Sequence, residues 1–447
     1  MNQIAIGDPL MGFLVLEGQS VAPPNVKATL SLAYSSDPFL KESIAIEFKG
    51  LPGEIQSALA KLEIIIQRAK LYEHVSYASP QYLRFQPEAG GPYYYTPITD
   101  IYLSANPAGY RHRPTGSLVV YMFYTRPNHF DGPQTQLSLS GRAGTHFPGW
   151  YPLRNHTDSG AGDGSTVLIQ KNDAATVLPA PLRFEYIFDS PGSARLKDLY
   201  VGIFHHGSYD GDLPFFAYYN SLSGGTQHAD PNAIQGHYRS VSWTSSAWFD
   251  FTKYLIDSPF IAYFDGRSFR PILRLFATHA YTDLYFRVQI ERFGDVLYVS
   301  EPIYSPPNTG YIILPPIDLP PNYLLREQAP SRVQVSLYAR RISGATSTIQ
   351  FDCLTIFPLA YAATFHGFIN LKYDQVLVDD SHRQRHNARM VVSSQETVAH
   401  TRQGSDLLLF PNQFSRVFFY AASHQDEMPP AYQGVVKVYY RPRLRLL

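Results

Sequence analysis

Five aromatic residues near the middle of the chain have side chains that could bind a ligand. They bracket a polar stretch, and they are Tyr218, Tyr219, Tyr238, Trp243 and Trp248. Exposed aromatic rings stack on the apolar faces of sugars, so this set is a candidate glycan-binding site. The alternative interpretation places the same rings in the core of a β-sandwich, which is the commoner environment for large aromatic side chains.

A second group, His205, His206, Asp210 and Asp212, has side chains of the kinds that hold metal ions. Adjacent histidines on a strand point to opposite faces of a sheet, so these two could not ligate one metal without a bend. No second cluster lies at ligand spacing. The sequence therefore predicts a strand end followed by an Asp-Gly turn, with no metal site and no cofactor.

The segment 158–165 contains carboxylates and glycines, as calcium-binding loops do. Its spacing does not match the ligand positions of an EF-hand loop. We therefore expect a connector between domains at this point.

Motifs of catalysis are absent from the sequence. It contains no Gly-x-Ser-x-Gly, Walker or Gly-x-Gly-x-x-Gly pattern. The single cysteine, Cys353, lies in the apolar run 349–357 and is predicted to be a small core residue. We therefore expect a protein that is not an enzyme. Paired carboxylates for glycoside hydrolysis stay an alternative, because such pairs meet in space and not in sequence.

The composition predicts a large β protein. A length of 447 residues suggests two to four domains, and 14% aromatic residues with 35 prolines is typical of β-sandwiches and barrels. The 37 basic and 37 acidic residues balance, so there is no basic excess of the kind that nucleic-acid-binding proteins carry. No apolar run approaches the ~20 residues of a membrane span, and the N-terminus lacks the features of a signal peptide.

One helix is predicted, over residues 54–72. It follows Pro52-Gly53, and its apolar residues recur at helical spacing, which predicts one buried stripe that packs on a sheet. The stripe consists of Ile55, Leu59, Leu62, Ile66 and Ala69. The almost continuously apolar run 117–124 predicts a central strand.

Three domains are predicted along the chain. Residues 1–145 form a β-rich domain with the helix, and residues 146–358 form a jelly-roll-like β-sandwich that includes a hairpin of 283–291 with 296–304. Residues 359–447 form a C-terminal β domain that we expect to pack with the first, so that the middle is an inserted module.

The order of these elements at the two ends resembles the distal tail proteins of long-tailed bacteriophages. The resemblance covers about half of the chain and rests on the helix at 54–72, the strands at 82–85 and 118–124, and the C-terminal segments 407–412, 417–420 and 436–443. It implies a tube-like β-sandwich with one flanking helix and an outward-facing sandwich. It also implies ring-forming oligomers at the tail tip, a passage for DNA, and contacts with tail tube and tip proteins.

The leading hypothesis is therefore a virion structural protein of a phage tail tip, assembled in the host cytoplasm into a ring, whose middle module contacts host carbohydrate. Low charge and many aromatic residues suit large interfaces. Two alternatives stay open. One is a free glycan-binding protein or glycoside hydrolase with β-sandwich domains, and the other is a capsid protein with two jelly rolls.

Overall fold

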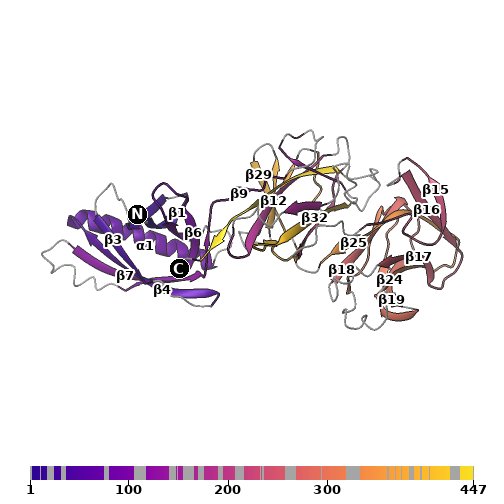
Figure 1. The fold of residues 1–447 in the computed structure, drawn as a ribbon, viewed down its shortest axis with the longest axis horizontal. Coiled ribbons are helices and arrows are strands. Elements are labelled where there is room, and N and C mark those ends of the chain that lie inside the picture. Colours follow the sequence, from indigo (N-terminus) through magenta and orange to yellow (C-terminus); the bar gives the residue numbers. More distant parts are fainter. Residues whose placement is uncertain are drawn as a thin grey trace. The chain divides into compact units, whose positions relative to one another are not determined.

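The structure is a computed structural model of the full chain, shown in Figure 1. It describes all residues except 1–2, 11, 18–24, 32–36, 75–79, 105–116, 140–146, 148, 155–165, 170–175, 190–194, 207–215, 232, 234–235, 257–267, 293, 319–332, 360–361, 368, 374, 382–386, 393–394, 402, 423–432 and 446–447. The chain divides into two compact units. Unit 1 comprises Met1–Thr135, Ala175–Ala180 and Arg441–Leu447, and unit 2 comprises Gln136–Ala174 and Pro181–Tyr440.

Unit 1 is a curved antiparallel sheet with a helix packed on it (Figure 1). The main path of the sheet runs β2 (Gly12–Glu17), β1 (Gln3–Asp8), β5 (Gln81–Gln86), β6 (Tyr94–Ser104), β7 (Ser117–Pro127), β4 (Phe39–Lys49) and β3 (Asn25–Ser31). The short strands β8 (Phe130–Asp131) and β34 (Arg443–Leu444) pair with each other beside β6. Strand β7 pairs with β4 and β6, which confirms the prediction of a central strand.

The helix α1 (Pro52–His74) confirms the predicted helix over 54–72 and extends it by two residues at each end. Proline fits the first helical position, because its missing N–H would have no partner there. The Glu54 carboxylate accepts a hydrogen bond from the backbone N–H of Leu51 at 2.9 Å, which satisfies a donor just before the helix. The predicted stripe is confirmed for Leu62, which is 0% exposed. Leu59 is only half-buried, and Ala58 and Ile65 are buried in addition.

Unit 2 contains two β-sandwiches. The first has one sheet of β10 (Tyr151–Arg154), β33 (Gln433–Tyr440), β12 (Ala180–Phe188), β27 (Val376–Asp380), β28 (Asn387–Val392) and β29 (Gln395–Thr401), with β31 (Leu408–Leu409) and β9 (Thr135–Gln136) beside it. The other sheet runs β11 (Thr166–Ile169), β32 (Phe414–Ala422), β13 (Asp198–His206), β26 (Ala362–His366) and β30 (Gln403–Gly404). Phe184 and Phe419 meet edge to face between the sheets, with centroids 5.4 Å apart.

The second sandwich carries the aromatic residues singled out by the sequence. One sheet runs β15 (Thr226–Ala229), β16 (His237–Trp243), β25 (Ser347–Pro358), β18 (Ser268–Ala277) and β22 (Tyr311–Ile313), with β14 (Phe216–Tyr218) and β23 (Ile317–Asp318) added. The other runs β17 (Phe249–Ile256), β24 (Val333–Arg341), β19 (Leu284–Arg292) and β20 (Asp295–Val299), with β21 (Ile303–Tyr304) beside β19. The pairing of β19 with β20 and β21 confirms the predicted hairpin.

The C-terminal strands lie elsewhere than the sequence predicts. Residues 359–447 were expected to pack with the first domain, but β32 pairs with β11 and β13, and β33 pairs with β10 and β12. That expectation is therefore wrong for these strands, and only β34 joins the sheet of unit 1. The apolar pattern of β32 and β33 shows that they are buried, but it does not identify their partners, because strand pairing is non-local.

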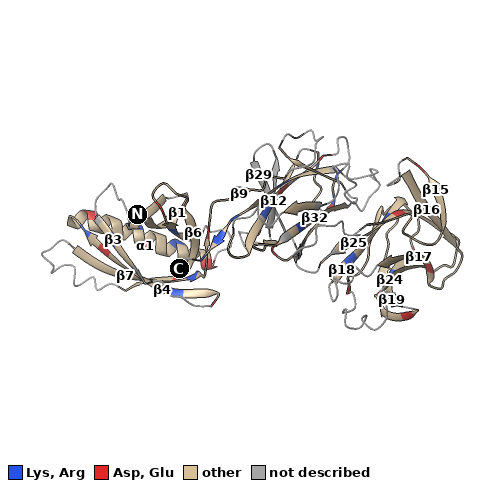
Figure 2. Ribbon diagram, viewed as in Figure 1, with Lys and Arg blue, Asp and Glu red and all other residues tan. Residues whose placement is uncertain are grey.

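Charged residues are sparse in both units. Figure 2 shows Lys and Arg interspersed with Asp and Glu, and no stripe of one sign follows any strand among the described residues. The equal numbers of basic and acidic residues in the sequence agree with this distribution.

The burial of Leu62 gives a direct test of how α1 is held. Leu62→Ala is expected to lower the free energy of unfolding of unit 1 by roughly 2–5 kcal/mol, because it leaves a cavity in the core. Lys70→Ala is the control on the same helix, since the Lys70 side chain is exposed. The measurement is hydrogen exchange of the α1 amides in the full chain. Equal protection in the two variants would contradict the packing described here.

Candidate functional site

The structure separates the five aromatic residues that the sequence grouped. Tyr218 and Trp243 are 8% and 6% exposed and lie in the second sandwich of unit 2. Trp243 stacks on Phe249 with ring centroids 5.8 Å apart. These two rings therefore belong to the core, as the alternative interpretation holds, and neither offers a face to a sugar.

Tyr219 and Tyr238 are half-buried near β16, and other rings cover them. Tyr219 stacks on His237 at 4.6 Å between centroids. Tyr238 lies between His228 at 5.0 Å and Phe276 at 4.2 Å, nearly parallel to Phe276. Neighbouring rings stack on these two tyrosines, so the covered ring faces are not open for stacking on a sugar.

Trp248 lies on a different surface, the outer side of the sheet β17-β24-β19. Side chains alternate along these strands. Phe286 and Leu337 are 1% exposed and face the core, whereas Arg287 and Tyr338 are half-buried on the outer side. We call this surface the Trp248 face and define it by Trp248, Tyr285, Arg287, Glu291, Tyr304, Tyr338 and Arg340.

The side chains of the Trp248 face form two rows across the strands. In the first, Arg340 contacts Trp248, and in the strand register it is paired with Tyr285, which is paired in turn with Tyr304. In the second, Tyr338 is paired with Arg287, whose guanidinium lies 5.0 Å from the Tyr338 ring centroid. The register thus places cations and aromatic rings next to each other on one face.

The indole ring of Trp248 contacts the guanidinium groups of two arginines. Arg287 lies 4.6 Å and Arg340 lies 5.0 Å from the centre of its indole ring. Stacking on an aromatic ring holds a guanidinium in a fixed plane while its N–H groups stay directed outward. Both cations therefore lie within 5.0 Å of the centre of one ring.

Glu291 organises the polar end of the same face. Its carboxylate accepts hydrogen bonds from the side-chain amides of Gln289 and Gln334, each at 2.8 Å. It also accepts one from the Tyr338 hydroxyl at 3.3 Å. Acceptors and amide groups of this kind match the hydroxyl groups of a sugar.

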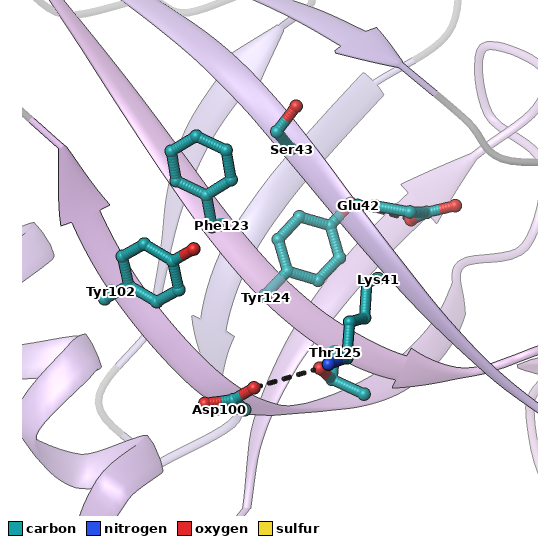
Figure 3. A pocket seen from close by; sticks show the side chains of 8 residues that line it. All are labelled: Lys41, Glu42, Ser43, Asp100, Tyr102, Phe123, Tyr124 and Thr125. Atoms are coloured by element: carbon teal, nitrogen blue, oxygen red, sulfur yellow. Dashed lines mark hydrogen bonds between the residues drawn. The ribbon is translucent and has the colours of Figure 1, made fainter.

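A second surface feature lies in unit 1, on the outer side of β4, β6 and β7 (Figure 3). It is a hollow of about 310 Å³. Tyr102 and Phe123 stack in it, with centroids 5.0 Å apart and planes at 13°. Lys41 and Asp100 line its polar part, and the Thr125 hydroxyl donates to the Asp100 carboxylate at 3.5 Å. Stacked aromatics beside a few charges are typical of protein contact surfaces.

A buried ion pair supports the strands beneath this hollow. Arg126 donates to the Glu42 carboxylate through Nε and Nη2, both at 2.7 Å, and the Tyr124 hydroxyl donates to it at 2.9 Å. The Glu42 and Arg126 side chains are 0% and 4% exposed. Burial and the negative charge of Glu42 raise the pKa of Tyr124 well above its usual value, so this hydroxyl stays a donor.

The remaining candidate residues divide into two groups. Cys353 is 1% exposed, which confirms the core prediction, and burial with the nearby Asp352 charge raises the pKa of its thiol far above the usual value. The side chains of His205 and His206, together with Asp210, Asp212 and the segment 158–165, lie outside the described residues. Among the residues that the structure describes, no group of His, Cys, Asp or Glu is arranged to hold a metal ion.

No described helix is long and apolar enough to cross a membrane.

The sequence interpretation missed Arg287, Arg340 and Tyr285. A signal was present, because Leu284–Arg292 and Val333–Arg341 place polar or aromatic side chains at every second position between apolar ones. That pattern indicates an outer sheet face. It does not indicate which tryptophan lies beside it, because the contact depends on strand register.

Comparison with known proteins shows coarse similarity to phage baseplate chains. A chain of the phage P2 baseplate in its activated conformation with Ca matches with a TM-score of 0.29 and 8% identity, covering 100% of both chains. A chain of the phage p2 baseplate with Sr has a TM-score of 0.21 and 10% identity, over 79% of this chain and 98% of that one. A chain from the infectious bursal disease virus Gx strain has a TM-score of 0.18 and 8% identity, over 71% and 80%. No family model and no curated protein matches.

The buried pair gives the prediction for this surface. Arg126→Met is expected to lower the free energy of unfolding of unit 1 by about 3–5 kcal/mol, because the Glu42 carboxylate stays buried without its guanidinium. The double variant Glu42→Met/Arg126→Met is expected to recover most of that loss, because it removes both charges. Urea unfolding followed by hydrogen exchange in β4 and β7 provides the measurement. A double variant that is less stable than the single one would contradict this account.

Proposed function

We propose that this chain is a virion structural protein of a phage tail tip, similar to a distal tail protein, and that it assembles into an oligomeric ring through unit 1. The observation that carries the proposal is that unit 1 presents apolar side chains to solvent on two opposite sides. Exposed apolar surfaces of this kind are often buried between subunits of an assembly.

The first of these surfaces is the outer stripe of α1. Ile64 and Leu71 are 52% and 51% exposed and are seven residues apart, so they lie on one side of the helix. The opposite side of α1, which includes Leu62, packs in the core. The exposed stripe therefore points away from the sheet.

The second surface is the outer side of β6 and β7. Tyr102 and Tyr121 are each 50% exposed, and Phe123 lies between them in the strand register, beside the hollow of Figure 3. Val120 and Met122, which alternate with them along β7, are fully buried on the side of the sheet that faces α1. This aromatic surface therefore points away from the helix.

Two different surfaces on opposite sides suit a head-to-tail contact. When the helix stripe of one copy contacts the sheet surface of the next, the same contact repeats around a ring. The ring would connect tail tube and tip proteins in the virion. Unit 2 would then carry the other functions of the protein. The proposal includes no catalytic activity.

Mass photometry of the purified chain tests the proposal, because a ring exceeds the 50.4 kDa of one copy severalfold. Ile64→Glu and Tyr121→Glu are each expected to shift the population to monomers, since each places a charge in the contact. Ile342→Glu is the matched control, because Ile342 is 57% exposed and lies in unit 2. A wild-type chain that stays monomeric at micromolar concentration would favour the free glycan-binding protein or hydrolase instead.

Mixing the two variants distinguishes a ring from other assemblies. In a head-to-tail contact, Ile64→Glu and Tyr121→Glu copies share one intact pair of surfaces, so an equimolar mixture is expected to form dimers that do not grow. If Ile64→Glu alone still assembles, the helix stripe is not part of the contact. Closed shells in place of rings would favour the double jelly-roll capsid alternative.

A further inference from the structure

We infer that the Trp248 face of unit 2 is a binding site for an oligosaccharide that carries an anionic group, with Arg287 and Arg340 as the anion-binding residues. This inference does not depend on the proposed function. It holds equally for a ring subunit and for a free monomer.

The first step is the charge of the two guanidiniums. Among the residues that the structure describes, no carboxylate and no hydrogen-bond acceptor pairs with Arg287 or Arg340, and their contacts are with the rings of Trp248 and Tyr338. The Nε atoms of both are buried without a hydrogen-bond partner. By contrast, Arg341 on the same strand donates to Asp283 at 2.7 Å. The two free guanidiniums therefore have unused capacity for an anion.

The second step is their orientation. Both guanidiniums contact one indole ring, which limits their conformational freedom before a ligand arrives. Guanidinium forks bind carboxylate and phosphate oxygens with two parallel hydrogen bonds. Less conformational entropy is lost on binding when the donors are already in place. An anionic group is the ligand that these donors would bind.

The third step is what surrounds the anion site. In the first row, Tyr285 and Tyr304 continue from Arg340, with ring centroids 5.6 Å apart and Tyr304 46% exposed. Three strand spacings of about 4.8 Å make this row about 14 Å long. Exposed tyrosine rings stack on the apolar faces of sugars. The row is therefore long enough for a short oligosaccharide whose charged unit lies at Arg340.

The fourth step excludes a nucleic acid as the better ligand. Glu291 lies on the same face, four residues from Arg287 along β19, and its carboxylate accepts a hydrogen bond from Tyr338, whose ring lies beside the Arg287 guanidinium. A phosphate backbone carries a charge at every residue and would meet this carboxylate. A sugar hydroxyl would instead donate a hydrogen bond to it. The face therefore favours a chain with an occasional charge over a polyanion.

Isothermal titration calorimetry with the full chain tests the site. The probes are tri-galacturonic acid, its fully methyl-esterified form, a phosphorylated maltotriose and oligodeoxythymidylate. At least one acidic saccharide is expected to bind, with an affinity that falls as salt rises, and which of the two binds identifies the anion. Arg287→Gln and Arg340→Gln are each expected to weaken binding about 10-fold or more. Arg445→Gln is the matched control, because Arg445 is an exposed arginine of unit 1.

Three results would overturn the inference. The first is equal binding of the methyl ester, which would show that charge is not recognised. The second is equal or tighter binding of oligodeoxythymidylate, which would indicate a phosphate-backbone site. The third is that the wild-type chain binds neither acidic saccharide at millimolar concentration. Circular dichroism checks that both arginine variants fold as wild type.

Discussion

Hydrogen bonds of Arg443 join three segments of unit 1, and the division of the chain into two units depends on this junction. Its Nε donates to the Asp131 carboxylate at 2.8 Å, and its backbone N–H donates to the Thr176 hydroxyl at 3.0 Å. Val177 donates from its backbone N–H to the Arg443 carbonyl at 3.0 Å. The last residues of the chain thus complete unit 1, although the strand just before them, Gln433–Tyr440, belongs to unit 2. Unit 2 is therefore an insertion into unit 1. The chain returns to unit 1 at Arg441 and not at residue 359, where the sequence predicted the start of the C-terminal domain.

Local patterns predicted the elements that depend on neighbours in sequence. The helical spacing of Ile55 and Leu62, the continuous apolar run of β7 and the burial of Cys353 all follow from residue type and period. The partners of β32 and β33 do not follow, because any buried strand satisfies the same apolar pattern. Backbone groups require some partner, and only the whole fold decides which one.

The same limit applies to the candidate site. Residue type marked Trp248, but it marked Trp243 equally. Trp243 ends β16 with its ring buried, whereas Trp248 precedes β17 and its ring lies beside Arg287 and Arg340. Arg287 and Arg340 come from strands about fifty residues apart in sequence and meet only through the register of β19 with β24. The sequence therefore shows some of the residue types that such a site uses, and the pairing of strands in the sheet brings those residues together.

The account assigns different tasks to the two units. In unit 1, apolar side chains on α1 and on β6–β7 suit contacts between copies, while the buried Glu42–Arg126 pair holds the strands behind the aromatic surface. In unit 2, the sandwich cores bury many aromatic rings, and the Trp248 face leaves charged and aromatic side chains for a ligand. Electron cryomicroscopy of the purified chain tests the central claim most directly. The account predicts closed rings in which the α1 stripe of each copy contacts the β6–β7 surface of the next. Single 50.4 kDa particles, or rings joined through unit 2 with both of these surfaces in solvent, would contradict it.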